Sequence, residues 1–169
     1  NFFIIEEPNK QTQWVNNAAN VVQWRKGLLD GIHGFDLELA RMGTDGLTLI
    51  ARNVPVKPNK LNIYLSNVPA GDDYFLIFIN STHGVMHTTS SKFTILEPNA
   101  TPSSTSTVML DPNVPTVTIQ GGPNPTAFFA TTFPAISGAV MGRVEWVKLM
   151  TMAGVVVGGM VGGVGLVGL

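Results

Sequence analysis

The stretch that most constrains the fold runs from Val68 to Thr82 and reads VPAGDDYFLIFINST. It begins with turn-forming residues and continues from Tyr74 to Ile79 as an apolar run that is rich in aromatic and β-branched side chains. These residue types favour a strand, and the run leaves no polar face for water. We therefore predict a central strand that is flanked on both edges and covered by another layer of the protein.

Weaker strand patterns lie on both sides of this run. Residues 35–40 and 61–66 alternate between apolar and polar side chains, as expected for a strand with one face toward a core. Turn residues separate these segments at intervals of about 8 to 12 residues, which gives about seven short strands in total. The pattern predicts an all-β fold over residues 1–97, an immunoglobulin-like or fibronectin-like antiparallel β-sandwich. The other predicted strands are residues 2–5, 20–25, 47–52 and 92–95.

Two aromatic residues fit this architecture. Trp24 lies on an alternating strand and would fill the core that a disulfide pins in antibody domains, a bond that this cysteine-free chain lacks. Tyr74 directly follows the turn before the central strand, where a tyrosine corner can form. The rest of the predicted core comprises Phe35, Leu37, Ile63, and Leu76 or Ile77.

The composition changes after Pro98. Residues 98–136 contain many prolines, threonines and serines, with Asp111 as the single charged residue, so we predict an extended stalk. Hydroxyl side chains flanked by proline are common acceptors of O-linked sugar. The candidate acceptors are Thr101, Ser103, Ser104, Thr105, Ser106 and Thr107.

Residues 137–169 form an apolar tail with three interpretations. Small residues, a spacer that ends at Lys148 and an uncharged run from Leu149 to Leu169 match the layout of a GPI-attachment signal, with Ser137 as the preferred attachment residue and Gly138 as the alternative. The run is also long enough for a transmembrane helix, although its many glycines weaken a helix. A glycine-rich packing or fibre-forming segment is the third interpretation. We favour the GPI signal.

Charge and sequons indicate the compartment. The net charge of -1 argues against nucleic-acid binding, which needs a clustered basic surface. A first residue other than Met, Asn1, fits the removal of a signal peptide. Asn80-Ser81-Thr82 and Asn99-Ala100-Thr101 are N-glycosylation sequons, whereas proline excludes Asn124-Pro125-Thr126. We therefore expect an extracellular protein that is glycosylated at Asn80 and Asn99.

Candidate chemical sites are few, and we predict no catalytic residue, metal or cofactor. His83 and His87 are four residues apart, but Gly84 between them argues against a helix that would bring them together. Asp36 and Glu38 share a strand face, which is loosely compatible with a glycosidase pair, yet solvated polar positions explain them better. Trp14 is the aromatic residue expected to be exposed and able to stack on a sugar ring, with partial burial at the sandwich edge as the alternative.

Several framework segments together carry a family resemblance. They are Ile5-Glu6-Glu7-Pro8, Trp14, Val22-Gln23-Trp24, Phe35-Asp36-Leu37-Glu38-Leu39, Val68-Pro69-Ala70-Gly71-Asp72-Asp73-Tyr74 and Ser90-Ser91-Lys92-Phe93-Thr94-Ile95. With these residues the chain resembles the fungal Ser/Thr-rich GPI-anchored membrane protein family, whose N-terminal domain is similar to that of yeast proteins needed for cell-wall β-1,6-glucan assembly.

The resemblance implies a non-catalytic protein of the fungal cell surface or wall that organises or binds wall β-glucan. Its expected partners are wall polysaccharide, wall proteins and the plasma membrane through a GPI anchor. Adhesion or self-assembly through the glycine-rich tail is the alternative function, and a polysaccharide-active enzyme is the weakest of the three.

Overall fold

The computed structural model describes residues 3–27, 30–103, 108–121 and 131–134. Within these ranges the chain is all-β and contains no helix, which confirms the predicted all-β class. The strands are β1 (Phe3–Glu7), β2 (Gln13–Val15), β3 (Ala19–Lys26), β4 (Gly34–Arg41), β5 (Thr44–Pro55), β6 (Lys60–Ser66), β7 (Gly71–Asn80), β8 (Val85–Thr89), β9 (Phe93–Leu96), β10 (Thr116–Gln120) and β11 (Thr131–Thr132).

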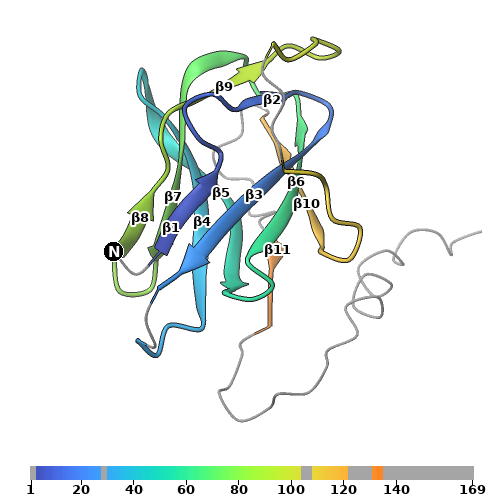
Figure 1. Ribbon diagram of the computed structural model, residues 1–169. Helices are drawn as coiled ribbons and strands as arrows, with labels where there is room; N and C mark the ends of the chain where they lie inside the picture. Colours follow the sequence, from blue (N-terminus) through green and yellow to red (C-terminus); the bar gives the residue numbers. More distant parts are fainter. Residues whose placement is uncertain (1–2, 28–29, 104–107, 122–130, 135–169) are drawn as a thin grey trace, which may run out of the picture.

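The strands form two sheets that lie face to face (Figure 1). Sheet A has four strands in the order β1-β3-β6-β10. Sheet B has the order β11-β5-β4-β7-β9-β2, with β8 paired to β7. Neighbouring strands are antiparallel except at three edge positions, where β10 pairs with β6, β11 with β5 and β2 with β9 in parallel. The apolar run around Phe75 is thus flanked on both edges, as predicted, because β7 lies between β4 and β9.

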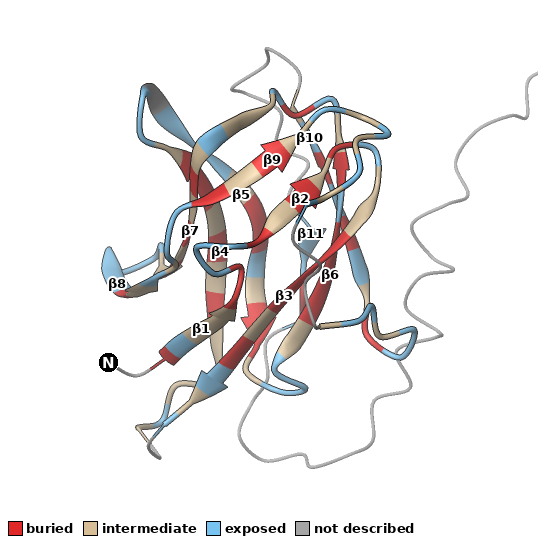
Figure 2. Ribbon diagram, turned by 45° about the horizontal axis from the view of Figure 1, so that its top comes forward, coloured by how far each residue is buried: buried red, intermediate tan, exposed pale blue. Residues whose placement is uncertain are grey.

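One hydrophobic core fills the space between the sheets (Figure 2). Trp24 of sheet A lies edge-on to two rings of sheet B, with 5.2 Å between its centroid and that of Phe35 and 5.7 Å to that of Phe78. Its indole Nε1 donates a hydrogen bond of 3.0 Å to the Val56 carbonyl. The predicted core residues Trp24, Phe35, Leu37, Ile63 and Leu76 are all buried, which confirms that part of the prediction, whereas Ile77 is half-buried.

The turn before β7 has the hydrogen bond expected of a tyrosine corner. The Tyr74 hydroxyl donates to the Pro69 carbonyl at 2.6 Å. The Arg41 guanidinium lies 5.2 Å from the centroid of the Tyr74 ring, and its Nε donates to Asp73 Oδ1 at 2.7 Å. The corner therefore fixes the start of β7 against the hairpin between β4 and β5.

The domain boundary predicted at residue 97 needs a correction. β10 adds to sheet A beside β6, and it buries Val117 and Ile119 in the shared core. Phe133, which follows β11, is also in this core; its N–H donates to the Arg52 carbonyl and its carbonyl accepts from Asn53 Nδ2. These parts of the expected stalk are structural, because alternate apolar residues among the threonines provide one face that fits the open side of the two sheets.

Candidate functional site

Trp14, the predicted glycan contact, does not lie on the surface. Its side chain is 3% exposed, and its ring centroid lies 4.6 Å from that of Phe93 in the core. β2 places it there by pairing in parallel with β9, with Trp14 opposite Ile95. The prediction that Trp14 is exposed is wrong, because its polar neighbours in the sequence conceal a three-residue edge strand.

Tyr64 is the most exposed aromatic side chain of the described ranges, at 36%. It lies on the outer face of sheet A, because Leu61, Ile63 and Leu65 of the same strand point into the core. Tyr64 is opposite Thr118 of β10 in the parallel pairing. We call this uncharged surface the Tyr64 strip; it consists of Tyr64, Ser66, Thr116, Thr118 and Gln120.

The Tyr64 strip was not predicted from the sequence, because residues 116–120 were expected to lie in a stalk. The sequence TVTIQ does alternate, and the structure buries Val117 and Ile119 while Thr116, Thr118 and Gln120 are exposed. This alternation was the available signal, although it spans only five residues and says nothing about which strand it joins.

The second exposed surface is the outer face of sheet B, around Glu38. In the registers of β4, Glu38 lies opposite Leu49 of β5 and Ile77 of β7. Asp36, one row along, lies opposite Ile79, which in turn lies opposite Met86 of β8. We call this surface the sheet B face; its apolar members are Leu47, Leu49, Phe75, Ile77, Ile79 and Met86.

Asp36 has a structural role on this face. Its Oδ1 accepts a hydrogen bond of 2.7 Å from the Asn53 N–H. Its Oδ2 accepts from the N–H of Ser81 at 3.3 Å and from the Ser81 hydroxyl. Asp36 therefore ties β4 both to β5 and to the turn between β7 and β8, and these bonds occupy both carboxylate oxygens.

Glu38 has a different environment from its neighbour. Its Oε2 is buried and accepts no hydrogen bond from the described part of the chain. Burial raises the pKa of the Glu38 carboxyl, the charge of Asp36 raises this pKa further, and the charge of Arg52 lowers it. The two carboxyl groups thus have different environments. Because both Asp36 oxygens accept hydrogen bonds from Asn53 and Ser81, Asp36 does not form an acid and base pair with Glu38.

We expect Glu38→Gln to increase the free energy of unfolding at pH 7 and to have less effect at pH 4. Because the pKa of Glu38 is higher in the folded chain, the folded state loses stability as pH rises through this pKa and Glu38 ionises, whereas below the unfolded pKa no such loss occurs. Urea unfolding at the two pH values measures the difference. Equal effects of the substitution at both values would contradict the raised pKa.

His83 and His87 do not form a site. His83 is exposed in a turn, whereas His87 is buried with its ring centroid 5.6 Å from that of Phe3. Burial lowers the pKa of His87, Asp30 raises it and Lys26 lowers it. Among the described residues, no three His, Cys, Asp or Glu side chains are grouped so that they could hold a metal ion.

Both sequons lie on the surface. Asn80 ends β7, and Ser81 and Thr82 follow it as exposed residues of the turn. Asn99 is exposed, with a φ of 61°, in a turn closed by a 3.2 Å hydrogen bond from the Ala100 N–H to the Glu97 carbonyl. Glycosylation at both positions stays a prediction that the geometry permits. Of the other candidate modification sites, Thr101 and Ser103 are exposed, whereas Ser104, Thr105, Ser106, Thr107, Ser137 and Gly138 lie outside the described residues.

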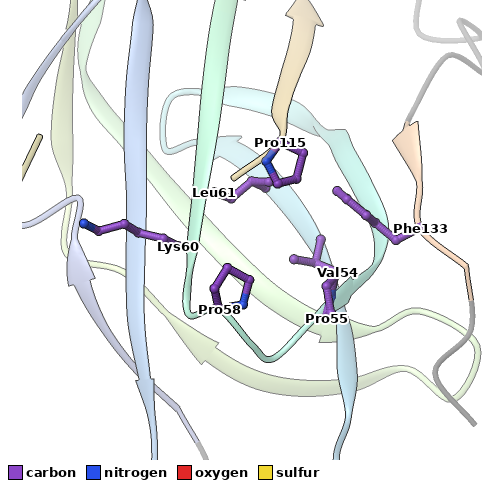
Figure 3. A pocket seen from close by; sticks show the side chains of 7 residues that line it. All are labelled: Val54, Pro55, Pro58, Lys60, Leu61, Pro115 and Phe133. Atoms are coloured by element: carbon purple, nitrogen blue, oxygen red, sulfur yellow. The ribbon is translucent and has the colours of Figure 1, made fainter. Parts of the chain in front are cut away.

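A small apolar pocket lies where residues beyond 97 meet the two sheets (Figure 3). Its empty volume is about 220 Å³, including space that is open to solvent. The part that a water-sized sphere can occupy is about 10 Å³, far below the roughly 300–1,000 Å³ that is common for small-molecule pockets. We interpret the pocket as an incompletely packed part of the core between the two sheets. Its lining comprises Val54, Pro55, Pro58, Lys60, Leu61, Pro115 and Phe133.

Comparisons with protein-family models, curated proteins and solved structures found no match for this chain. The family resemblance therefore rests on the framework residues alone and stays a prediction. Across the described ranges, no helix is long and apolar enough to span a membrane.

Proposed function

We propose that the chain is a non-catalytic module of the fungal cell surface, built as an immunoglobulin-like β-sandwich, that binds neutral β-glucan through the Tyr64 strip. The strand order supports this fold, since β1, β3 and β6 form one sheet and β4, β7 and β9 form the centre of the other. The Tyr74 corner is a further feature that immunoglobulin domains share, and Trp24 of β3 fills the core that a disulfide pins in antibody domains.

The observation that carries the ligand proposal is the chemistry of the Tyr64 strip. A half-exposed phenol ring offers an apolar face to the C–H groups of a sugar, and the surrounding hydroxyl and amide groups can exchange hydrogen bonds with sugar hydroxyls. The absence of charge among the five strip residues suits a neutral polymer. The paired segments of β6 and β10 extend for about 13 Å, so an extended chain can lie along the strip.

The carboxylates support a binding role rather than a hydrolytic one. A glycosidase needs an acid and a base that face each other across the scissile bond. Here the Asp36 oxygens accept hydrogen bonds from Asn53 and Ser81, and Glu38 lies between Leu49 and Ile77. The small apolar pocket contains neither of these carboxylates.

The surface location of the module has separate support. Asn80 and Asn99 are accessible for N-glycosylation, and the layout of residues 137–169 fits a GPI-attachment signal. The proposed location is therefore the outer face of the plasma membrane or the cell wall. Mass spectrometry of surface protein tests the tail: a peptide from residues 149–169 in the mature protein would contradict processing.

We expect Tyr64→Ala to weaken binding to insoluble β-glucan about tenfold, because the variant loses a ring contact worth about 1.4 kcal/mol. Pull-down of the recombinant 169-residue chain over a range of glucan concentrations measures the dissociation constant. Met109→Ala is the matched control, since Met109 is an exposed side chain outside the strip and its truncation should leave binding unchanged.

The same experiment tests the enzyme alternative. Soluble sugar released from glucan or chitin is measured in parallel for the unaltered chain and for Glu38→Gln. Release that disappears in Glu38→Gln would overturn the non-catalytic proposal. Binding that is equal for the unaltered chain and Tyr64→Ala would instead remove the strip as the site and favour a protein partner.

A further inference from the structure

β7 has apolar side chains on both of its faces. Leu76 and Phe78 point into the core, whereas Phe75, Ile77 and Ile79 alternate with them and are half-buried. Among the described residues, sheet B packs against sheet A on one side only. Antiparallel sheets usually turn a polar side to water, so an apolar outer row on the central strand indicates a contact surface.

Apolar side chains lie on both sides of β4, whose own outward residues are two carboxylates and the buried Ala40. Leu47 of β5 lies opposite Ala40 of β4, which lies opposite Phe75 of β7. The outermost members are strongly exposed, with Leu47 at 57% and Met86 at 61%. Large apolar side chains on adjacent strands, rather than scattered ones, are typical of an interface.

The charges on the sheet B face are of both signs. Asp36 and Glu38 lie along its middle strand, and Arg52 is an exposed cation of β5 whose charge acts on Glu38. In a symmetric dimer every contact occurs twice, so the Arg52 of each copy can meet a carboxylate of the other copy. The net charge of -1 adds little repulsion between copies. The face therefore presents both a cation, Arg52, and a carboxylate, Glu38, to a second copy.

We propose that the sheet B face is a self-association surface through which two copies of this chain form a dimer. Four strands at about 4.8 Å spacing and three rows of residues at about 6.8 Å spacing give a patch of about 400 Å² for each copy. The total of about 800 Å² is below the size of standard specific interfaces and corresponds to a weak, transient contact. The dimer is consequently weak and depends on concentration, with dissociation in the micromolar range or above.

Sedimentation velocity of the full 169-residue chain between about 1 and 300 µM tests the proposal, in a range set by the dissociation constants of weak complexes. The test variant combines Leu47→Glu with Met86→Glu, which places two like charges on the apolar edges of the face. We expect its dissociation constant to rise at least tenfold. The control combines Ile4→Glu with Met109→Glu, which adds the same charge at exposed positions elsewhere and should leave the constant unchanged.

Two outcomes overturn the proposal. One is an unaltered chain that stays monomeric over the whole range. The other is association whose dissociation constant is the same in the test and control variants, whether or not it differs from that of the unaltered chain. The second outcome also covers association through residues 137–169, which both variants retain. A second measurement uses the absence of native cysteine. Met86→Cys should be cross-linked by a bismaleimide at least ten times faster than Met109→Cys, and equal rates would also overturn the proposal.

Discussion

A chain that ends at residue 97 will fail to fold, whereas a chain of residues 1–134 will unfold cooperatively. The longer chain contains Val117, Ile119 and Phe133, which bury their side chains in the common core. Full burial of such side chains stabilises a protein by about 1.5–3 kcal/mol each, so the shorter chain loses about 5–9 kcal/mol. Since the whole free energy of unfolding of a domain is about 5–15 kcal/mol, this loss is decisive.

Far-UV circular dichroism and urea unfolding of the two chains measure this difference. Within residues 1–134, Ile119→Ala should cost about 2–5 kcal/mol and Phe133→Ala about 3–5 kcal/mol. Met109→Ala is the matched control, because an exposed side chain at 81% contributes less than about 0.5 kcal/mol. A folded 1–97 chain with the stability of the longer one would contradict the revised boundary.

The main strands could be predicted from the sequence because each has its own hydrophobic period. The alternation around Phe35 and Leu37 corresponds to β4, and the alternation around Ile63 corresponds to β6. The apolar run at Phe75 to Ile79 corresponds to the most central part of sheet B. In these segments local preference and long-range packing agree, and the residues that face the core follow directly from the pattern.

The edge strands could not be predicted in the same way. β2 and β11 have three and two residues, too few for a period to be recognised. β10 is longer, but prolines and threonines surround it, and its partner β6 ends 50 residues before it begins, at Ser66 and Thr116 respectively. These strands are stabilised by pairing with an edge strand that is far away in the sequence, and the composition of a segment does not indicate that partner.

The candidate surfaces depend on register, which explains why their members were only partly predicted. The alternation of β6 does place Tyr64 opposite the core-facing residues, so its exposure was available from the sequence. Its neighbour Thr118 was not, because it comes from β10. Likewise, the sequence puts Glu38 and Asp36 on one face, but only the pairing with β5 and β7 reveals that Leu49 and Ile77 surround Glu38.

The two proposed surfaces lie on opposite sides of the domain, and this arrangement has a functional consequence. A dimer joined through the sheet B face would turn both copies of sheet A, with their Tyr64 strips, outward. Two weak sites on one particle bind a repetitive polymer with an avidity that exceeds either affinity by about 10²–10⁴ when the spacing permits both contacts. Weak self-association would therefore be useful to a glucan-binding module at a crowded wall.

Trp24→Ala is expected to lower the free energy of unfolding by about 3–5 kcal/mol. The indole lies between the sheets against Phe35 and Phe78, so truncation leaves a cavity that rigid neighbours cannot fill. It also leaves the Val56 carbonyl without the hydrogen bond from Nε1. Trp24→Phe separates the two effects, since it keeps most of the ring volume and should cost about 1–3 kcal/mol for the unsatisfied carbonyl and the smaller ring.

Urea unfolding followed by far-UV circular dichroism measures both variants, and Tyr64→Ala provides the comparison for an aromatic residue at the surface. Removal of the Tyr64 ring should cost about 1–2 kcal/mol, because 36% of the side chain is exposed to water in the folded chain. If Trp24→Ala and Tyr64→Ala lower the free energy of unfolding by similar amounts, the contact between the two sheets does not depend on the Trp24 indole. A loss of 3 kcal/mol or more for Trp24→Ala alone would identify Trp24 as the residue that joins sheet A to sheet B.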